Sequence, residues 1–237
     1  MGQFSVTHHK MIASTNDEAR RLAVEGAPHR TVVHADEQSG GRGRLSRRWF
    51  SPPGNLYISI VLRTGQPPSR TAELSFVTAL AVADTVDSLL PQTVRATLKW
   101  PNDVLVDGAK IAGILLEQVD DATIIGIGLN ILQAPTNIAY KATTILASGG
   151  LASVDQARDS LLECLGRHLE IWSQDGFGPV RDQWLERSFP IGAAIRANSA
   201  GESIAGAFAG MDADGALLLD TPSGRRRIVA GDLAIGG

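Results

Sequence analysis

Cysteine is almost absent from this chain of 237 residues, in which Cys164 is the only one. A single thiol forms no disulfide within the chain and offers no ligand cluster for a structural zinc ion. A chain of this length buries enough apolar surface to fold without such cross-links. Cys164 stands in the apolar stretch LLECLG, where we expect a buried, unreactive thiol rather than a nucleophile.

Long apolar runs are also missing. No segment reaches the roughly 18 apolar residues that cross a membrane, and the first residues, MGQFSVTHHKMIAS, lack the pattern of a secretory signal. We therefore expect a cytoplasmic protein with no membrane association.

An excess of charge of one sign is lacking too, since 22 Lys and Arg face 25 Asp and Glu, a net charge of −3. This balance argues against general nucleic-acid affinity, so any anion site must be a local group of basic residues. His8 and His9 have no further ligands at metal-binding spacing, and no protein-held metal site is predicted.

Three stretches repeat apolar residues at helical spacing, namely 15–25, 71–90 and 155–172. Thr15 and Glu18 have the spacing of a capping box at the first, and Ser153 and Gln156 have it at the third. Pro91 ends the second.

Strand patterns lie between the helices, at 56–62, 93–100, 104–106, 111–119 and 123–131. In the first, Leu56 and Ile58 alternate with Tyr57 and Ser59, as in a sheet with two unlike faces. Asp107-Gly108 is a strong two-residue hairpin signal. Hairpins between consecutive strands favour an antiparallel or mixed sheet, and with the helices they predict an α+β fold.

The pattern changes near Phe189, after a helix that ends around Trp184–Arg187. From Ile191 onward only short strands and turns follow, which is typical of a small β-barrel. We place the boundary between residues 188 and 189, giving a larger domain at 1–188 and a small one at 189–237.

The segment DEQSGGRGRLSRRW, residues 36–49, concentrates glycine and arginine. Its glycines permit tight turns and close approach to a ligand. Four arginines fall within seven positions, namely Arg42, Arg44, Arg47 and Arg48. Ordering such a segment is costly because like charges repel and glycine loses much entropy, and a bound anion would remove part of that cost. A solvated basic loop is an equal alternative on spacing alone.

A second segment, LKWPNDVLVDGAKIAGILLE, covers residues 98–117. Pro101 interrupts a strand pattern, so Asn102 and Asp103 are expected at a break in the sheet rather than within a ladder. Lys110 follows the hairpin turn, and Gly113 leaves room beside the backbone in mid-strand.

A third segment, Gly126-Ile127-Gly128-Leu129-Asn130, is no dinucleotide fingerprint because its third glycine and following helix are missing. Its glycines suit a planar ligand with Asn130 as a hydrogen-bonding end, or a core strand thinned for packing.

These segments, together with STNDEAR at 14–20, resemble in order and spacing the biotin protein ligase family, over essentially the whole chain. GMDADGALLL and Gly231-Asp232 resemble the SH3-like C-terminal domain of that family. The resemblance implies a catalytic domain built on a mixed sheet with flanking helices, related to class II synthetases and lipoate ligases.

Site residues follow from the resemblance position by position. Those expected to bind biotin are Ser14, Thr15, Asn16, Gln38, Gly41, Arg42, Gly43, Arg44, Lys110 and Gly113. Those expected to bind ATP or the adenylate are Arg44, Arg47, Trp49, Asn102, Lys110 and Asn130. Catalytic roles are expected for Arg42, Lys110 and Asp103. Ser46 stands where the family often has glycine, which leaves the path of the loop open.

The resemblance implies that biotin and ATP form biotinyl-AMP and pyrophosphate, and that a carrier lysine then takes the biotin. Both first-step reactants are anions, which explains a need for fixed cations. Magnesium is expected, held mainly by the phosphates. Asp103 is the candidate to orient or deprotonate the lysine of a biotin carboxyl carrier protein.

Alternatives remain at this stage. A lipoate-type ligase shares the adenylate chemistry, and a non-catalytic biotin-binding module would need no arginines. Only 13 residues precede Ser14, so no DNA-binding domain and no DNA binding are expected. Exposed strand edges suit either a homodimer or carrier docking, and Arg225-Arg226-Arg227 is expected to be an exposed hairpin.

Overall fold

The computed structural model describes residues 3–67, 70–136, 138–199 and 201–235. The elements of the first part of the chain are β1 (Ser5–Ile12), α1 (Thr15–Val24), β2 (Thr31–Gln38), the short 3-10 turn η1 (Arg44–Ser46), β3 (Leu56–Leu62), α2 (Glu73–Leu89), β4 (Ala96–Lys99), β5 (Asp103–Val106), β6 (Ala109–Val119) and β7 (Ala122–Leu129). They are followed by α3 (Val154–Asp175), α4 (Phe177–Glu186), β8 (Ala194–Ser199), β9 (Glu202–Met211), β10 (Leu217–Thr221), β11 (Gly224–Ile228) and β12 (Asp232–Ile235).

Seven strands form one mixed sheet in the order β1-β2-β3-β7-β6-β5-β4. β1 and β2 run parallel, and the other neighbouring pairs are antiparallel. The hairpin expected at Asp107-Gly108 is present, with φ of 49° and 73° at its two residues. The predicted α+β architecture with a mixed sheet is confirmed, although β1 and β2 had no counterpart in the sequence-based expectations.

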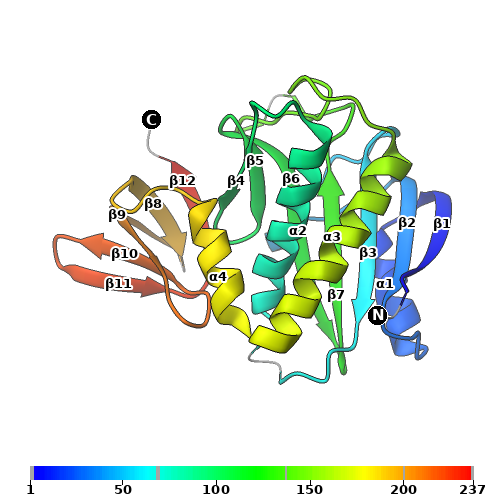
Figure 1. Cartoon of the computed structure of the whole chain (residues 1–237), viewed down its shortest axis with the longest axis horizontal. Helices are drawn as coiled ribbons and strands as arrows, with labels where there is room; N and C mark the ends of the chain where they lie inside the picture. The colour runs from blue at the N-terminus through cyan, green and yellow to red at the C-terminus, as the bar shows by residue number, and fades with distance from the viewer. Residues whose placement is uncertain (1–2, 68–69, 137, 200, 236–237) are drawn as a thin grey trace.

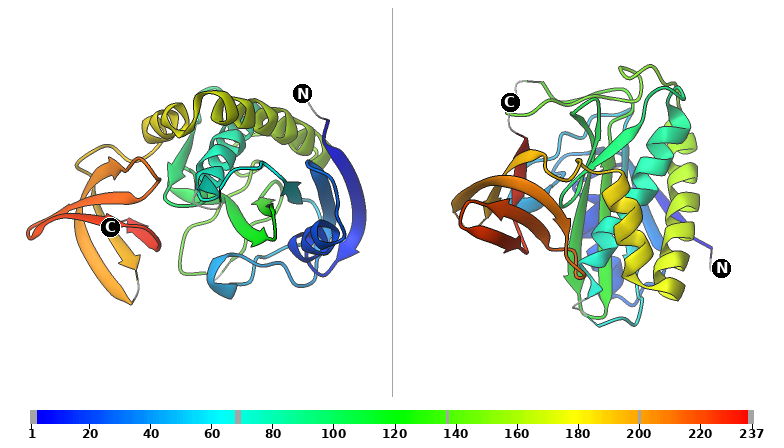
Figure 2. Two further views of the ribbon diagram at one scale, coloured as in Figure 1. Left: turned by 90° about the horizontal axis from the view of Figure 1, so that it is seen from below. Right: turned by 60° about the vertical axis from the view of Figure 1, so that its left-hand side comes forward.

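Helices cover both faces of this sheet (Figures 1 and 2). On one face α1 packs through Ala19 and Ala23 against Val33, Val61 and Ile124. On the other face α2 lies on the sheet and packs against α3 and α4. Alternate residues of β3 point to the two opposite faces of the sheet, as its sequence pattern predicts. Every residue of β3 is nevertheless buried, because neither face meets solvent there.

The start of α1 differs from expectation. Ser14 is the N-cap, and its Oγ accepts a hydrogen bond from the Asp17 backbone N–H at 3.3 Å. The predicted Thr15–Glu18 capping pair is therefore wrong, and the Thr15 hydroxyl is instead hydrogen-bonded to Gln38. Helix α3 begins at the predicted capping box, in which Ser153 and Gln156 each bond the other's backbone N–H.

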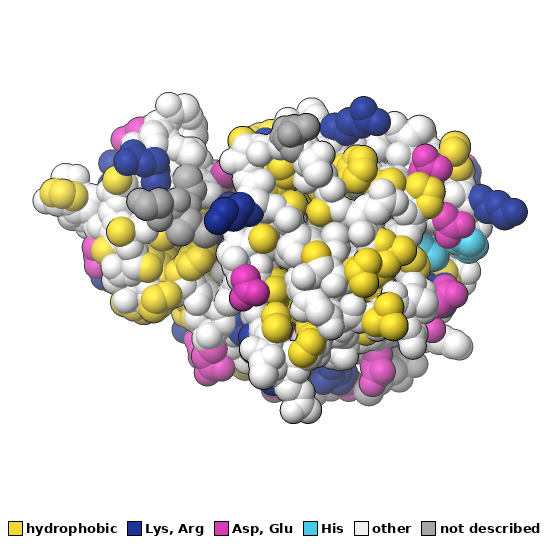
Figure 3. Space-filling model, turned by 90° about the horizontal axis from the view of Figure 1, so that it is seen from above, with side chains coloured by type: hydrophobic (Ala, Val, Ile, Leu, Met, Phe, Trp, Pro, Cys, Tyr) yellow, Lys and Arg dark blue, Asp and Glu magenta, His cyan; other side chains and the backbone are white. Residues whose placement is uncertain are grey.

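The last five strands form a separate antiparallel sheet in the order β11-β10-β9-β8-β12. It makes a smaller lobe beside the larger one (Figure 3). The Trp100 indole N–H donates to the Gly215 carbonyl at 3.0 Å, which ties this sheet to the end of β4. A Cβ on Gly215 would lie 2.5 Å from the Phe76 ring, so only glycine permits this approach. The boundary that we propose, between 188 and 189, falls in the connection from α4 to β8.

In the described part of the chain no helix is long and apolar enough to cross a membrane. Cys164 is buried on α3, as expected.

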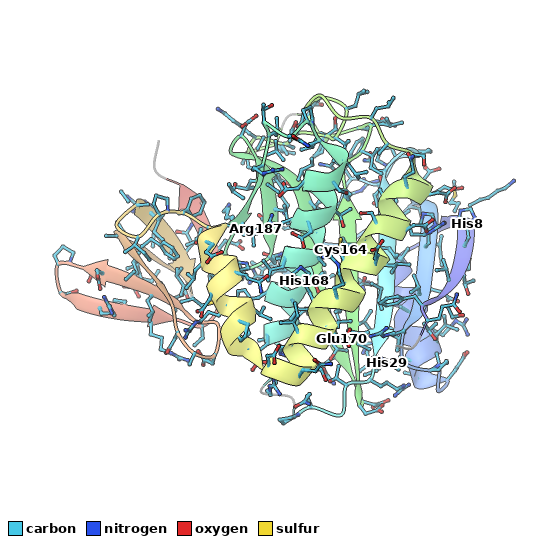
Figure 4. The ribbon with its side chains drawn as sticks, in the orientation of Figure 1. His8, His29, Cys164, His168, Glu170 and Arg187 are labelled. Carbon is cyan, nitrogen blue, oxygen red and sulfur yellow. The ribbon has the colours of Figure 1, made fainter. Side chains whose placement is uncertain are left out.

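A partly buried polar network joins the three helices on the outer face. Asp84 on α2 accepts from His168 of α3 at 2.8 Å and from Arg187, just after α4, at 2.6 Å (Figure 4). Arg187 also donates to Asp87 at 2.9 Å. Burial would raise the pKa of Asp84, but the His168 hydrogen bond and the Arg187 charge outweigh it and hold that pKa below its ordinary value.

This network predicts a pH-dependent contribution to stability. Because the pKa of Asp84 is lower in the folded chain, its contribution is complete above the pKa of a free aspartate, about 3.9, and is lost as the pH falls toward the folded value. We expect Asp84→Asn to lower the free energy of unfolding by about 2 kcal/mol at pH 7, with a smaller difference at pH 3. Urea unfolding of parent and variant at both pH values measures this.

The matched control is Asp159→Asn on α3, whose carboxylate is mostly exposed and pairs with Arg158. Exposed pairs contribute little, so this variant should unfold like the parent. An Asp84→Asn difference that stays constant from pH 7 to pH 3 would contradict the role given to the carboxylate charge.

Candidate active site

A cavity of about 650 Å³ opens on the α1 side of the seven-stranded sheet. Its walls come from the start of α1, the end of β2, the arginine-rich segment after β2, strands β4 to β7 and the start of β12. A second hollow of about 290 Å³ adjoins it and shares Trp49, Lys110 and Tyr140 with it. On the face drawn in Figure 3 basic and acidic side chains are interspersed. The lining of the larger cavity includes the basic residues Arg42, Arg44, Arg47, Arg48, Lys99, Lys110 and Lys141.

A change of register between β5 and β6 determines which face Lys110 occupies. Asp103 pairs with Gly113, but Leu105 pairs with Lys110, so Ile111 is an extra residue in β6. In a regular strand Lys110 and Gly113, three positions apart, would point to opposite faces. The β-bulge restores them to one face, and a Cβ on Gly113 would lie 3.2 Å from the Lys110 Nζ. Lys110 thereby points into the cavity beside Asp103.

Lys110 and Asp103 form the ion pair at the centre of the cavity, with Nζ 2.6 Å from Oδ1. Both side chains are largely buried, at 16% and 18% exposure. The ammonium group also lies 5.2 Å from the Trp49 ring centre and 5.6 Å from that of Tyr140, where the ring faces attract a cation. The sequence prediction that Asp103 stands outside a strand ladder is wrong, because it is the first residue of β5 and pairs with Lys99 and Gly113.

Glycines form the floor of the cavity. A Cβ on Gly128 would lie 2.4 Å from the Trp49 indole, and one on Gly113 would lie 2.9 Å from it. A Cβ on Gly126 would lie 2.1 Å from the Asn16 amide oxygen. A planar ligand was expected over the segment that holds Gly126 and Gly128, and at Gly128 the planar group in the structure is the protein's own indole, which also covers Gly113.

One end of the cavity is a network of uncharged polar groups. The Gln38 Oε1 accepts from the Thr15 backbone N–H at 2.8 Å, and the Ser59 hydroxyl lies 2.8 Å from Thr15 Oγ1 and 2.6 Å from Asn16 Oδ1. Asn16 donates to Glu117 at 2.7 Å. Ser14, Thr15 and Asn16 are almost fully buried. Because these hydrogen bonds already fix the side chains, a ligand can bind to them with little further loss of side-chain entropy.

The arginine-rich segment folds back over the cavity through a bridge between Arg42 and Arg48. Arg42 pairs with Asp17 at 2.6 Å and lies 3.6 Å from Glu117. Leu45 and Ser46 have φ of 55° and 56°, so Ser46 adopts the left-handed conformation that glycine adopts without cost.

The C-terminal domain holds the far end of this segment. Arg44 lies 3.2 Å from the Asp232 carboxylate and also donates to Asn102 and to the Gly231 carbonyl. Arg47 pairs with the same carboxylate at 2.5 Å. The repulsion expected among these arginines is thus offset by carboxylates from the chain itself.

Asn130 lines the second hollow rather than the first. Its amide N–H₂ donates to the Thr143 carbonyl at 3.1 Å, while its Oδ1 is buried and has no hydrogen-bond partner in the described part of the chain. A buried acceptor without a donor is costly, so this oxygen suits a ligand that brings an N–H group.

The structure brings the predicted site residues together. All of those predicted for biotin, ATP or catalysis line the larger cavity except Gly41, which lies behind the loop near Ser51, and Asn130. Arg225, Arg226 and Arg227 lie on exposed β11 and pair with acids of their own domain. The roles of the individual residues stay predictions.

Several residues of the site have no counterpart in the sequence-based assignment, namely Asp17, Ser59, Lys99, Glu117, Tyr140 and Asp232. Lys99 and Asp232 stand inside motifs that carry the resemblance, and Asp17 follows STN directly, so proximity to a motif was an available signal. Glu117 likewise ends the segment at 98–117. Ser59 carried no such signal, because only strand pairing brings it to α1.

The contact of Trp49 with the glycine floor predicts a measurable consequence. We expect Gly128→Ala to displace the indole from the sheet, because the added methyl overlaps the ring. Trp100, Trp172 and Trp184 are no more than 2% exposed, so acrylamide quenching of fluorescence should increase mainly through Trp49. Gly178→Ala in α4, where a Cβ meets nothing within 4 Å, is the control. Unchanged quenching in Gly128→Ala would contradict the contact.

Comparison with known proteins agrees with this geometry. The sequence pattern of the Biotin/lipoate A/B protein ligase family matches residues 9–131, and that of the Biotin protein ligase C terminal domain matches residues 191–236. The chain is 37% identical to a biotin--[acetyl-CoA-carboxylase] ligase of Paracoccus denitrificans, over 94% of this chain and 98% of that protein. It is 34% identical to the bifunctional ligase/repressor BirA of Bacillus subtilis, over 100% of this chain and 75% of BirA.

Among solved structures, a biotin protein ligase from Aquifex aeolicus in complex with biotin and ATP superposes with a TM-score of 0.84, at 26% identity and over 97% of both chains. Sequence and fold thus agree along the whole length, and the chain belongs to the biotin/lipoate A/B protein ligase family, with the C-terminal domain of the biotin protein ligases.

Proposed function

We propose that the chain is an ATP-dependent biotin protein ligase, which joins biotin to AMP and then transfers biotin to a lysine of a carrier protein. The observation that carries this proposal is the position of the Lys110–Asp103 pair, between a polar pocket on one side and a hollow with a buried free acceptor on the other. Two anions bound at these two ends would meet at Lys110.

Biotin is assigned to the end formed by Ser14, Thr15, Asn16 and Gln38. A ureido ring carries both N–H donors and a carbonyl acceptor, and this end offers hydroxyl and amide groups of both kinds. Because Gly126 has no side chain, Asn16 lies against the sheet there. A biotin whose ring binds at this end would have its carboxylate directed toward Lys110.

In the first step a biotin carboxylate oxygen bonds to the α-phosphorus of ATP, the bond from that phosphorus to the β-phosphate oxygen breaks, and pyrophosphate leaves with the electron pair. Both reactants are negative, so fixed positive charge lowers the barrier. Arg42 of the arginine-rich segment and Lys110 of β6, which both line the cavity, supply it. Asp17 and Asp103 hold these two side chains in place, and an entering anion replaces those carboxylates as their partner.

Adenine is assigned to the second hollow, where its exocyclic amine would donate to the free Asn130 Oδ1. The Trp49 ring forms a wall shared by both cavities and offers a face for stacking. Arg44 and Arg47 would meet the phosphates after release from Asp232.

Magnesium would enter with ATP. We expect this ion to take most of its ligands from phosphates and water. Asp103 and Asp232 line the cavity and are the carboxylates that would share it. When bound, magnesium neutralises charge on the leaving pyrophosphate.

In the second step the amine of a carrier lysine attacks the acyl carbon of biotinyl-AMP, and AMP leaves. The attacking amine must lose a proton, and Asp103 is the carboxylate nearest the centre of the cavity for orienting or accepting it. The named relatives support a biotin carboxyl carrier of acetyl-CoA carboxylase as the acceptor. The outer strand β1 has mostly exposed side chains, and its edge suits a carrier domain or a second copy of the chain.

The role of the two cations predicts the effect of their removal. With biotin, ATP and magnesium, Arg42→Ala and Lys110→Ala should each slow pyrophosphate release by on the order of 100-fold or more, as expected for loss of a fixed transition-state contact. The control is Arg225→Ala on exposed β11, which should match the parent. If either cavity variant activates biotin at the parent rate, the role of that side chain is wrong.

Ligand choice has a separate test. Biotin at roughly 100 times its Kd should stabilise the fold by about 2.7 kcal/mol, which thermal unfolding detects as a higher Tm, whereas lipoate should leave the Tm unchanged. The lipoate alternative is not favoured by the relatives, which are named as biotin ligases. Stabilisation by lipoate and not by biotin would overturn the proposal.

A further inference from the structure

Glu117 connects the start of α1 with the arginine-rich segment, and the roles above give it no part in the reaction. On β6 the residues Gly113, Leu115 and Glu117 alternate with those of the opposite face, so all three lie on the side of the sheet that α1 covers. Gly113 and Leu115 line the larger cavity. Glu117 is the next residue along this face, and its carboxylate contacts Asn16.

One carboxylate oxygen of Glu117 determines how the Asn16 amide is turned. Glu117 Oε2 accepts from Asn16 Nδ2 at 2.7 Å, and the Ser59 hydroxyl lies 2.6 Å from Asn16 Oδ1. An ionised carboxylate can only accept, so the amide nitrogen must face Glu117 and the amide oxygen must face Ser59. An amide has two N–H groups, and the second one of Asn16 has no hydrogen-bond partner in the described part of the chain. It is therefore left for a ligand in the cavity that Asn16 lines.

The other carboxylate oxygen of Glu117 faces the arginine-rich segment. Glu117 Oε1 lies 3.6 Å from Arg42 Nη2. The same guanidinium donates to both carboxylate oxygens of Asp17, at 3.0 and 2.6 Å. Arg42 is thus held between two carboxylates, one from α1 and one from β6.

The two carboxylates differ in how easily they can leave Arg42. The Asp17 side chain is 47% exposed, so it can turn to water when another anion takes its place. The Glu117 side chain is 24% exposed and is hydrogen-bonded to Asn16. A partly buried carboxylate needs a cation beside it, so Glu117 keeps Arg42 near the cavity after Asp17 has been displaced.

We propose that Glu117 is a positioning residue for the formation of biotinyl-AMP, a role that rests on the proposed ligase function. It turns the Asn16 amide so that an N–H group is presented to biotin. It also keeps Arg42 beside the cavity while the biotin carboxylate takes the place of Asp17. Glu117 acts through these two side chains and contacts neither reactant.

Two substitutions in the whole chain separate the two contacts. Glu117→Gln can still accept from Asn16 through its amide oxygen, but it places an N–H₂ group against Arg42. The Kd for biotin should stay within about twofold of the parent, because the Asn16 hydrogen bond is kept. Pyrophosphate release at saturating biotin and ATP should slow roughly 10-fold, as expected when a group beside the reacting atoms is misplaced. Glu117→Met removes both contacts and should also raise the Kd for biotin roughly 10-fold.

Double-mutant cycles distinguish positioning from a general loss of stability. In an Arg42→Ala background, Glu117→Gln should slow pyrophosphate release by less than about twofold more, because the side chain through which it acts is gone. In an Asn16→Ala background, Glu117→Met should leave the Kd for biotin unchanged. Effects that multiply in these backgrounds would overturn the proposal, since Glu117 would then act by another route.

The matched control is Glu25→Gln at the end of α1, where the carboxylate is exposed and pairs with Arg21. It should match the parent in both biotin binding and pyrophosphate release. Thermal unfolding with and without biotin shows that each variant is folded.

Failure of the proposed function and failure of this inference give different results. If the parent protein forms no biotinyl-AMP, the ligase function fails, and the role of Glu117 with it. If the parent forms biotinyl-AMP and Glu117→Gln does so at the same rate, only the role of Glu117 is wrong.

Discussion

The extra residue in β6 is the constraint on which the site depends. With regular pairing, Lys110 would point toward the core formed with α2, and its charge would have no place there. The bulge at Lys110-Ile111 turns the lysine to the cavity side while Ile111 remains fully buried. The bulge is held from outside the sheet, since Lys110 exchanges backbone hydrogen bonds with Lys141 and Thr143, and Asn130 donates to the Ile111 carbonyl. The bulge that positions Lys110 is therefore hydrogen-bonded to Asn130, which lines the hollow assigned to adenine.

Four cations of the cavity, Arg42, Arg44, Arg47 and Lys110, are each balanced by a nearby carboxylate. Each paired cation has a carboxylate from a different part of the chain, so Asp17 of α1, Asp103 of β5 and Asp232 of β12 meet in one place. Removing one partner of a partly buried pair leaves an uncompensated charge, which gives these contacts a strong preference for the folded arrangement. In the proposed reaction the same pairs would yield to a more highly charged anion, so one set of contacts would serve both stability and ligand exchange.

The C-terminal domain belongs to the site as well as to the core. Its Gly215 packs against Phe76 and accepts from Trp100, and its Asp232 holds two arginines of the loop. Trp100 and Lys99 are neighbours in the chain and both line the larger cavity, so the contact that docks the domain adjoins the cavity wall. Displacement of this domain would therefore alter the wall of the cavity directly.

Local periodicity, turn chemistry and short motifs were enough to predict the order of most elements, the Asp107-Gly108 hairpin and the motif residues that gather around the cavity. These local patterns missed β1 and β2, gave the wrong cap for α1 and put Asp103 outside the ladder. Only the tertiary structure decided that Lys110 shares a face with Gly113, that Ser59 and Glu117 meet α1, and that Asp232 reaches Arg44. Register, long-range pairing and domain contact join residues far apart in the chain, and no local pattern carries that information.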